Sequence, residues 1–94
     1  MAEGKETGKR AWKVILYPHL AEKSMNMVET ENKIVFIVTR NATREEIKKD
    51  VENSFSVKVD SVNVEITPKG RKKAYVKLSS ESSASDIASR LGML

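Results

Sequence analysis

Hydrophobic and polar positions follow two different periods along this chain, and together they predict both strands and helices. Short runs of β-branched and aromatic residues, continuous or alternating with polar ones, are typical of strands. Apolar residues spaced by three and four positions indicate one buried face of a helix. The predicted strands cover residues 12–17, 34–38, 56–66 and 73–78, and the predicted helices cover 20–29, 43–55 and 83–91.

The predicted helix ends differ in their capping residues. Thr43 and Glu46 have the spacing of a capping box, in which each side chain accepts a bond from the backbone N–H of the other residue. Ser83 is placed to cap the last helix, and Gly92 follows its end, where a left-handed residue is favoured. The first helix is expected to bury a weakly apolar face formed by Leu20, Ala21, Ser24, Met25 and Val28.

Three features shape the predicted strands. Pro18 ends the first strand, because proline cannot donate to a ladder. The alternation of 56–66 slips at Asp60 and Ser61, and a β-bulge there would return both apolar sets to the core side. The second set consists of Val62, Val64 and Ile66. The turn at 67–70 contains proline and glycine, so it predicts a hairpin with the strand that follows.

These elements predict an α+β fold in a single small domain. The run at 34–38 is continuously apolar, so it indicates a strand that is covered on both faces or lies near the sheet centre. We expect a four-stranded, mainly antiparallel sheet with helices packed on it, in the order β-α-β-α-β-β-α. Because 94 residues fit one core, we expect a flexible basic arm at 1–11 and one domain at 12–94.

Composition removes most kinds of catalytic site. The chain has no cysteine and one histidine, so thiolate or multi-histidine metal sites and Cys/His catalysis are excluded. Glu45 and Glu46 are explained by the start of a helix, and Gly70 is a lone turn glycine rather than a phosphate-binding loop. His19 is interpreted as a residue that enters a helix. We therefore expect no enzyme, no metal and no cofactor. No run is apolar enough to cross a membrane.

Positive charge is concentrated in two places. Residues 69–77 carry five basic side chains and no acidic one, and residues 1–13 carry four basic and two acidic ones. A patch of this kind favours a polyanion partner. RNA is preferred over DNA because no predicted helix is basic enough to enter a major groove. Period two places Lys73, Tyr75 and Lys77 on one strand face, where a ring could stack while the lysines meet phosphates.

The same face has two other interpretations. It could be an ordinary solvated strand face with favourable cross-strand pairs. It could also belong to a free-standing single-stranded RNA-binding module of the RNA-recognition type, although Lys72 and Lys73 replace a glycine and a stacking aromatic of that motif. The predicted RNA-binding residues are Lys9, Arg10, Trp12, Lys13, Lys23, Lys69, Arg71, Lys72, Lys73, Tyr75 and Lys77, with Arg40, Lys48 and Lys49 as weaker candidates.

Five stretches occur in a specific order and spacing along the chain: PHLAEK (18–23), NATREEIK (41–48), VENSFSVKV (51–59) with VN (62–63), KKAYVKL (72–78), and DIA (86–88) with LG (91–92). Together they resemble the universal large-subunit ribosomal protein family numbered twenty-three, in its archaeal form. The resemblance covers the chain from about Trp12 to its C-terminus.

This resemblance implies a structural protein that binds large-subunit rRNA beside the polypeptide exit tunnel, next to other ribosomal proteins in the cytoplasmic ribosome. It implies that Glu22 belongs to a docking surface for nascent-chain factors, with signal recognition particle as the expected partner of an archaeal member. It also implies no membrane insertion, and we expect a monomer when the protein is free. Two departures stand out. Ala21 occupies the usual Ser/Thr cap position, and the segment 67–71 is too short to line the tunnel as the bacterial extension does.

Overall fold

The computed structural model describes residues 13–92, which form four strands and three helices. Their order is β-α-β-α-β-β-α, so the predicted α+β class and element order are confirmed. The elements are β1 (Ile15–Pro18), α1 (Glu22–Thr30), β2 (Lys33–Val38), α2 (Arg44–Phe55), β3 (Val59–Ile66), β4 (Lys72–Leu78) and α3 (Ala84–Arg90).

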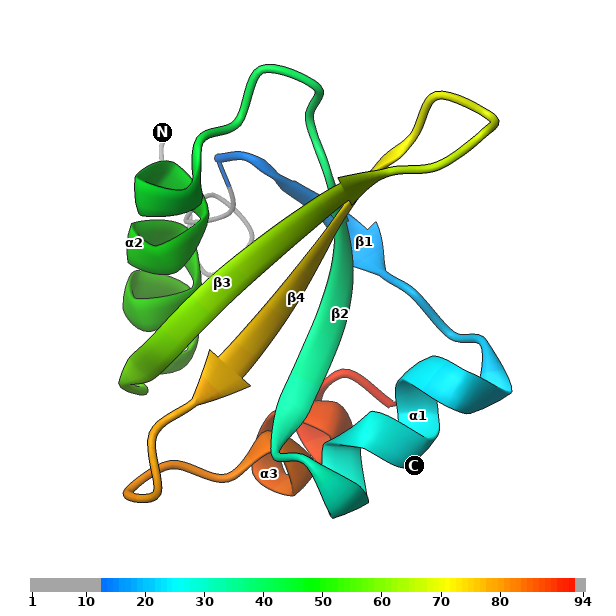
Figure 1. Cartoon of the computed structure of the whole chain (residues 1–94). Coiled ribbons are helices and arrows are strands. Elements are labelled where there is room, and N and C mark those ends of the chain that lie inside the picture. Colours follow the sequence, from blue (N-terminus) through cyan, green and yellow to red (C-terminus); the bar gives the residue numbers. More distant parts are fainter. Residues whose placement is uncertain (1–12, 93–94) are drawn as a thin grey trace.

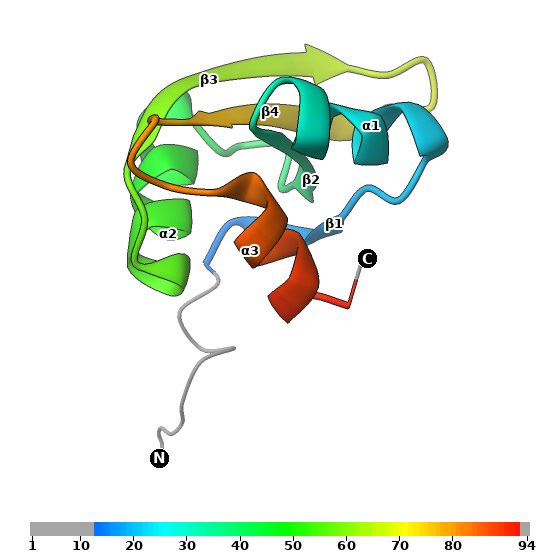
Figure 2. The same ribbon diagram turned by 90° about the horizontal axis from the view of Figure 1, so that it is seen from below.

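The four strands form one antiparallel sheet in the order β1-β2-β4-β3. Figure 1 looks onto the sheet, with α2 at the left beside β3 and with α1 and α3 side by side at one end. In the view turned by 90°, α2 and α3 lie on the same side of the sheet (Figure 2). Neither α2 nor α3 lies on the opposite side, which carries Lys73, Tyr75 and Lys77 of β4, and we call this side of the sheet the open face.

The hydrophobic core lies between the sheet and the helices, and every element contributes to it. Phe36 of β2 stacks on Phe55 of α2, with ring centroids 6.1 Å apart. Val35 and Ile37 point to the open face, yet they are buried as fully as the core residues because β2 lies between β1 and β4. The prediction of a strand covered on both faces, or near the sheet centre, is therefore confirmed.

The local signals of the sequence are also confirmed. The register between β3 and β4 shifts between Val59 and Ser61, which is the predicted bulge, and it leaves Val59 and Val62 both in the core. Thr43 and Glu46 form the capping box at the start of α2. The Ser83 side chain accepts a bond from a first-turn amide of α3. Each of these two helix caps provides a hydrogen-bond acceptor for backbone N–H groups that would otherwise lack a partner.

Three residues expected to be buried are exposed instead: Leu20, its neighbour Ala21, and Ile66. Leu20 is 59% exposed because α1 begins at Glu22, so the helical period that grouped Leu20 with Val28 does not extend to it. Ile66 is 51% exposed because it is the last residue of β3 and extends past the edge of the core. The predicted arm at 1–11 and the ring of Trp12 lie outside the described residues.

A buried carboxylate ties β1 to α2, and no sequence signal pointed to it. One oxygen of Asp50 accepts bonds from the backbone N–H groups of Lys13, Val14 and Ile15, at 2.9, 2.9 and 3.1 Å. The Asp50 side chain is almost fully buried. Three donors that converge on one charged oxygen fix the start of β1.

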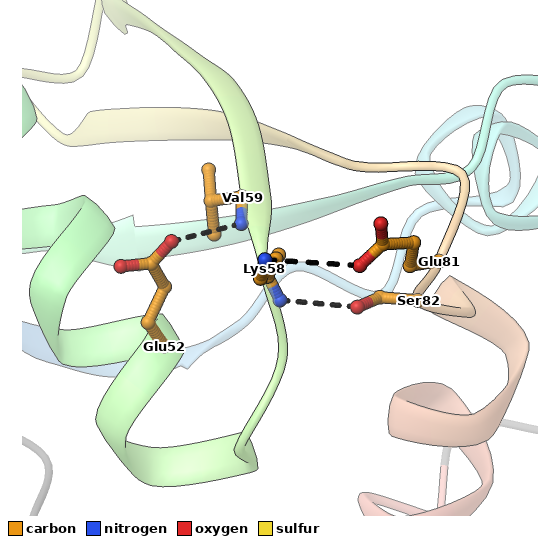
Figure 3. A network of polar contacts seen from close by, with 5 residues as sticks. All are labelled: Glu52, Lys58, Val59, Glu81 and Ser82. Atoms are coloured by element: carbon orange, nitrogen blue, oxygen red, sulfur yellow. Dashed lines mark hydrogen bonds and ion pairs between the residues drawn. The ribbon is translucent and has the colours of Figure 1, made fainter.

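A second set of polar contacts joins the start of β3 to its neighbours (Figure 3). Glu52 of α2 accepts a bond from the backbone N–H of Val59 at 3.0 Å, and the hydroxyl of Ser82 accepts one from Lys58 at the same distance. Lys58 also forms an ion pair with Glu81 at 3.8 Å, which is exposed and therefore weak. The segment before β3 is thus held between α2 and the loop before α3.

Asn32, between α1 and β2, holds the loop that leads into α3. It adopts a left-handed backbone conformation with φ of 54°. Its side-chain amide donates to the carbonyl oxygens of Ser79 and Ser82 at 3.2 and 3.1 Å, and its side-chain oxygen accepts from the backbone N–H of Ala84 at 2.8 Å. One asparagine therefore positions α3 against the sheet.

No helix within residues 13–92 is long and apolar enough to span a membrane. In the same residues, no group of three or more histidine, aspartate or glutamate side chains is placed to hold a metal ion.

Candidate nucleic-acid interface

The open face presents alternate residues of β4, because successive side chains of a strand point to opposite faces. Ala74 and Val76 are buried in the core, whereas Lys73, Tyr75 and Lys77 lie between them on the open face. Of these, Lys77 is exposed and the other two are half-buried. The structure thus brings together the three residues that period two had grouped.

Tyr75 occupies the middle of the open face. Its cross-strand neighbours are Val35 on β2 and Asn63 on β3. Its phenol donates a hydrogen bond of 2.7 Å to the carboxylate of Glu65. Burial, this hydrogen bond and the charge of Glu65 raise the pKa of Tyr75 above its ordinary value of 10.0, so the phenol remains a neutral donor at physiological pH. The hydroxyl is occupied, and the half-buried ring is what the side chain offers to a partner.

The turn between β3 and β4, residues 67–71, forms a rigid basic loop beside this face. The backbone N–H of Thr67 donates to the carbonyl of Arg71 at 2.8 Å, and that of Gly70 donates to the carbonyl of Thr67 at 2.8 Å. Gly70 has φ of +86°, a conformation that other residues rarely adopt. The guanidinium of Arg40 donates to the carbonyl of Gly70 at 3.0 Å and joins the loop to the segment after β2. Lys69 and Arg71 are exposed on the loop.

Lys72 lies next to Lys73 but belongs to the other face of the sheet. Its ammonium donates to the carbonyl oxygen of Ala42 at 2.6 Å and makes a longer contact of 3.4 Å with that of Arg40. The charge of Lys72 is therefore already engaged by the protein. The clustering of basic residues in the sequence does not separate Lys72 from Lys73. The alternation of side chains along a strand does separate them, because neighbouring residues point to opposite faces of the sheet.

His19 lies beside the open face, and sequence reasoning gave it no role. It lines a hollow of about 330 Å³ together with Ile37, Thr67, Pro68, Lys69, Arg71 and Lys73. Its Nδ1 is hydrogen-bonded to the Ser24 hydroxyl at 2.6 Å. Burial and then the charge of Lys73 lower the pKa of His19 below its ordinary value of 6.5, so the imidazole is neutral at pH 7.

None of the remaining predicted RNA-binding residues is among the described residues of this surface. Lys48 and Lys49 are exposed on α2, which packs on the opposite side of the sheet. Lys13 lines a different hollow beside α2, together with Lys49, Glu46 and Asp50. Lys23 is exposed on α1. The last three predicted residues, Lys9, Arg10 and Trp12, lie outside the described residues.

Glu22, the residue expected to dock factors, is the first residue of α1 and is exposed. The Ala21 cap position makes no side-chain hydrogen bond, as its lack of an oxygen predicted. Two exposed leucines lie near Glu22 in the chain, Leu16 on the edge strand β1 and Leu20 just before α1. An acidic helix start therefore adjoins an apolar segment that the core does not use.

A small sheet with helices on one side and with lysines, a tyrosine and a basic loop on the other is typical of a non-enzymatic nucleic-acid-binding protein. Comparison with known proteins shows which family of nucleic-acid-binding proteins this chain is similar to. A family model described as Ribosomal protein L23 matches residues 13–85. The large ribosomal subunit protein uL23 of Methanothermobacter thermautotrophicus is 46% identical to this chain over 80 residues, which are 85% of the chain and 93% of that protein.

A second relative gives the same result. The large ribosomal subunit protein uL23 of Methanococcus vannielii is 47% identical over 83 residues, which are 88% of this chain and 96% of that protein. The chain therefore belongs to the L23 family of ribosomal proteins, a family of the large ribosomal subunit, and both relatives are archaeal. It is a structural protein of the cytoplasmic ribosome without enzymatic activity. The resemblance stated from the sequence motifs is confirmed.

Proposed function

We propose that the chain binds large-subunit rRNA through the open face and the basic loop. The observation that carries this proposal is the position of Lys69, Arg71, Lys73 and Lys77, which the fold brings to one side of the sheet together with the ring of Tyr75. Membership of a large-subunit ribosomal protein family supports rRNA and neighbouring ribosomal proteins as partners.

Binding on this surface is driven by release of the counterions that surround RNA phosphates. Each phosphate that a lysine or arginine neutralises is expected to contribute roughly 0.7–0.9 to the slope of log affinity against log salt concentration. Tyr75 adds a stacking surface in the middle of the charged groups, which is worth on the order of 1–3 kcal/mol for a base that packs on it.

The test compares two triple variants of the full chain that remove the same charge. One variant carries Lys69→Gln, Lys73→Gln and Lys77→Gln. The matched control carries Arg44→Gln, Lys48→Gln and Lys49→Gln on α2, on the other side of the sheet. Affinity for a folded large-subunit rRNA fragment is measured across a salt series.

We expect the first variant to lower the salt slope by about 2 to 3, because each of the three lysines neutralises one phosphate. The control should change the slope by less than one. An equal change in the two variants would show that RNA does not bind preferentially on the open face.

A free-standing module for single-stranded RNA is the second candidate function. One feature of the structure disfavours it: on β4 the open-face position next to Tyr75 is occupied by Lys73, where such modules use a second aromatic ring. That function predicts similar affinity for any short single strand. The ribosomal function predicts a preference for one folded rRNA domain.

We also propose that the bound protein lies near the polypeptide exit tunnel, with Glu22 in a docking surface for signal recognition particle or another nascent-chain factor. The exposed start of α1 and the exposed side chains of Leu16 and Leu20, which lie close to it in the chain, support this assignment, since exposed apolar side chains suit a protein partner. The loop at 67–71 spans only five residues and gives no support to a tunnel-lining role.

The docking surface is tested by charge reversal at matched positions. Glu22→Lys is compared with Glu45→Lys, because both glutamates lie in the first turn of a helix and their reversal carries a similar helix-dipole cost. We expect Glu22→Lys alone to weaken recruitment of signal recognition particle to assembled ribosomes, with rRNA binding unchanged in both variants. Equal recruitment by the two variants would refute the role of Glu22.

A further inference from the structure

The hollow beside the basic loop combines three properties that an exposed strand face lacks. It is formed by three separate segments of the chain: His19 after β1, Ile37 on β2, and the loop with Lys73 from the β3–β4 hairpin. Its volume of about 330 Å³ falls within the range of ligand pockets, roughly 300–1,000 Å³. Among the described residues that line it, three are basic and none is acidic.

The lining also distinguishes a nucleotide from a simple anion. The buried side chain of Ile37 and the ring of Pro68 give the hollow apolar surface, and His19 contributes a flat aromatic ring. Bases pack on such rings through their faces. The charges of Lys69, Arg71 and Lys73 suit the phosphate groups that flank a base. A bare phosphate would leave the apolar surface and the aromatic ring without a partner.

We propose that this hollow is a subsite for one unpaired nucleotide of the rRNA, with the base packed on His19, Ile37 and Pro68 and its phosphates held by Lys69, Arg71 and Lys73. The subsite rests on the proposed rRNA binding and makes it more specific. A nucleotide from a loop or bulge fits best, because such a base is already free of its helix and needs little energy to enter a pocket. Contact with a base would add sequence preference to a surface that otherwise reads phosphates.

The geometry around His19 favours this role. Nδ1 is held by the hydroxyl of Ser24, a buried residue of α1, so the orientation of the ring is fixed before RNA arrives. No described residue bonds to Nε2. The neutral ring can therefore stack on a base and offer Nε2 to one of its edges.

The first experiment uses the wild-type protein, in which His19 is the only histidine. Its two ring nitrogens give a unique pair of NMR signals, which are recorded while the full chain is titrated with a folded large-subunit rRNA fragment and, separately, with inorganic phosphate. We expect both signals to shift on saturation with the RNA and to move much less with phosphate. Ring signals that do not move in the RNA complex would overturn the subsite.

The second experiment compares His19→Ala with Lys77→Ala, which changes the same face outside the hollow. Chemical probing at nucleotide resolution is carried out with both complexes saturated. We expect one unpaired nucleotide to be protected by the wild type and by Lys77→Ala, and to become reactive with His19→Ala. The affinity of His19→Ala should fall by roughly 5- to 150-fold, the equivalent of losing one stacked base.

A third variant separates stacking from folding. His19→Phe loses the bond to Ser24 but keeps an aromatic ring, so it should restore both the protection and most of the affinity. If His19→Phe behaves like His19→Ala, or if no nucleotide distinguishes His19→Ala from Lys77→Ala, the subsite is wrong while rRNA binding stands. If the wild type binds no folded rRNA fragment, the proposed function itself fails, and the subsite fails with it.

Discussion

Two adjacent lysines provide a direct test of the assignment of the open face. Lys72 and Lys73 are neighbours in the chain, carry the same charge and are both half-buried, but they lie on opposite faces of the sheet. The perturbation is a pair of single variants, Lys72→Met and Lys73→Met. Each removes one positive charge and its hydrogen-bond donors while keeping a side chain of similar length.

The two variants should affect different properties. Lys72→Met should lower stability, and Lys73→Met should weaken RNA binding. Lys72→Met removes the bond to the carbonyl of Ala42, and a charged hydrogen bond at a half-exposed site contributes about 1 kcal/mol to the free energy of unfolding. For a domain of this size that loss corresponds to a fall in Tm of roughly 4–8 °C. Lys73 makes no such bond to any residue within 13–92, so Lys73→Met should leave Tm within a few degrees.

The RNA assay supplies the second half of the comparison. We expect Lys73→Met to lower the salt slope by about 0.7–0.9, the contribution of one phosphate, and Lys72→Met to lower it by clearly less. Thermal unfolding followed by circular dichroism gives the stability, and a salt series with a folded rRNA fragment gives the slope. Equal slopes for the two variants, or a larger loss with Lys72→Met, would refute the assignment.

Three further predictions concern single groups. Asp50→Ala leaves the backbone N–H groups of Lys13, Val14 and Ile15, at the start of β1, without their acceptor. It should lower the free energy of unfolding by about 2–4 kcal/mol in urea titrations, and a loss below about 1 kcal/mol would contradict the described role of Asp50. Tyr75→Ala should weaken rRNA binding by on the order of 1–3 kcal/mol while Tyr75→Phe retains affinity, and no loss with alanine would favour an ordinary solvated strand face. The pKa of His19 lies below 6.5 in the folded chain, so the unfolded chain takes up the proton first as the pH falls. The free energy of unfolding should therefore decline as the pH drops through 6.5 towards the pKa of the folded chain. An NMR titration should show this low pKa and its rise in Lys73→Ala, and a pKa of 6.5 or above in the wild type would contradict the stated cause.

Local sequence signals predicted the fold well where a short pattern determined the structure. The capping box of Thr43 and Glu46 and the bulge after Val59 each depend on a few adjacent residues, and both are present. Leu20 was placed wrongly because the apolar period continues through it although the helix does not. The error therefore lay at an element boundary, where periodicity carries the least information.

The parts that the sequence could not reveal depend on contacts between distant segments. Asp50 resembles any acidic residue on an amphipathic helix, and its partners lie 35 to 37 positions earlier in the chain. The hollow at His19 likewise requires β1, β2 and the β3–β4 loop to meet. In contrast, the alternation of β4 was sufficient to place Lys73, Tyr75 and Lys77 on one face, because strand parity is a local property.

The central claim is that this member of the L23 family recognises a folded part of large-subunit rRNA through its open face. The most direct measurement is the affinity of the purified full chain for a set of large-subunit rRNA fragments and for a mixed-sequence single strand, across a salt series. The account predicts tight, salt-dependent binding to one folded fragment and much weaker binding to the others. Equal affinity for every fragment and for the single strand would contradict it, because a basic patch without shape recognition gives that result.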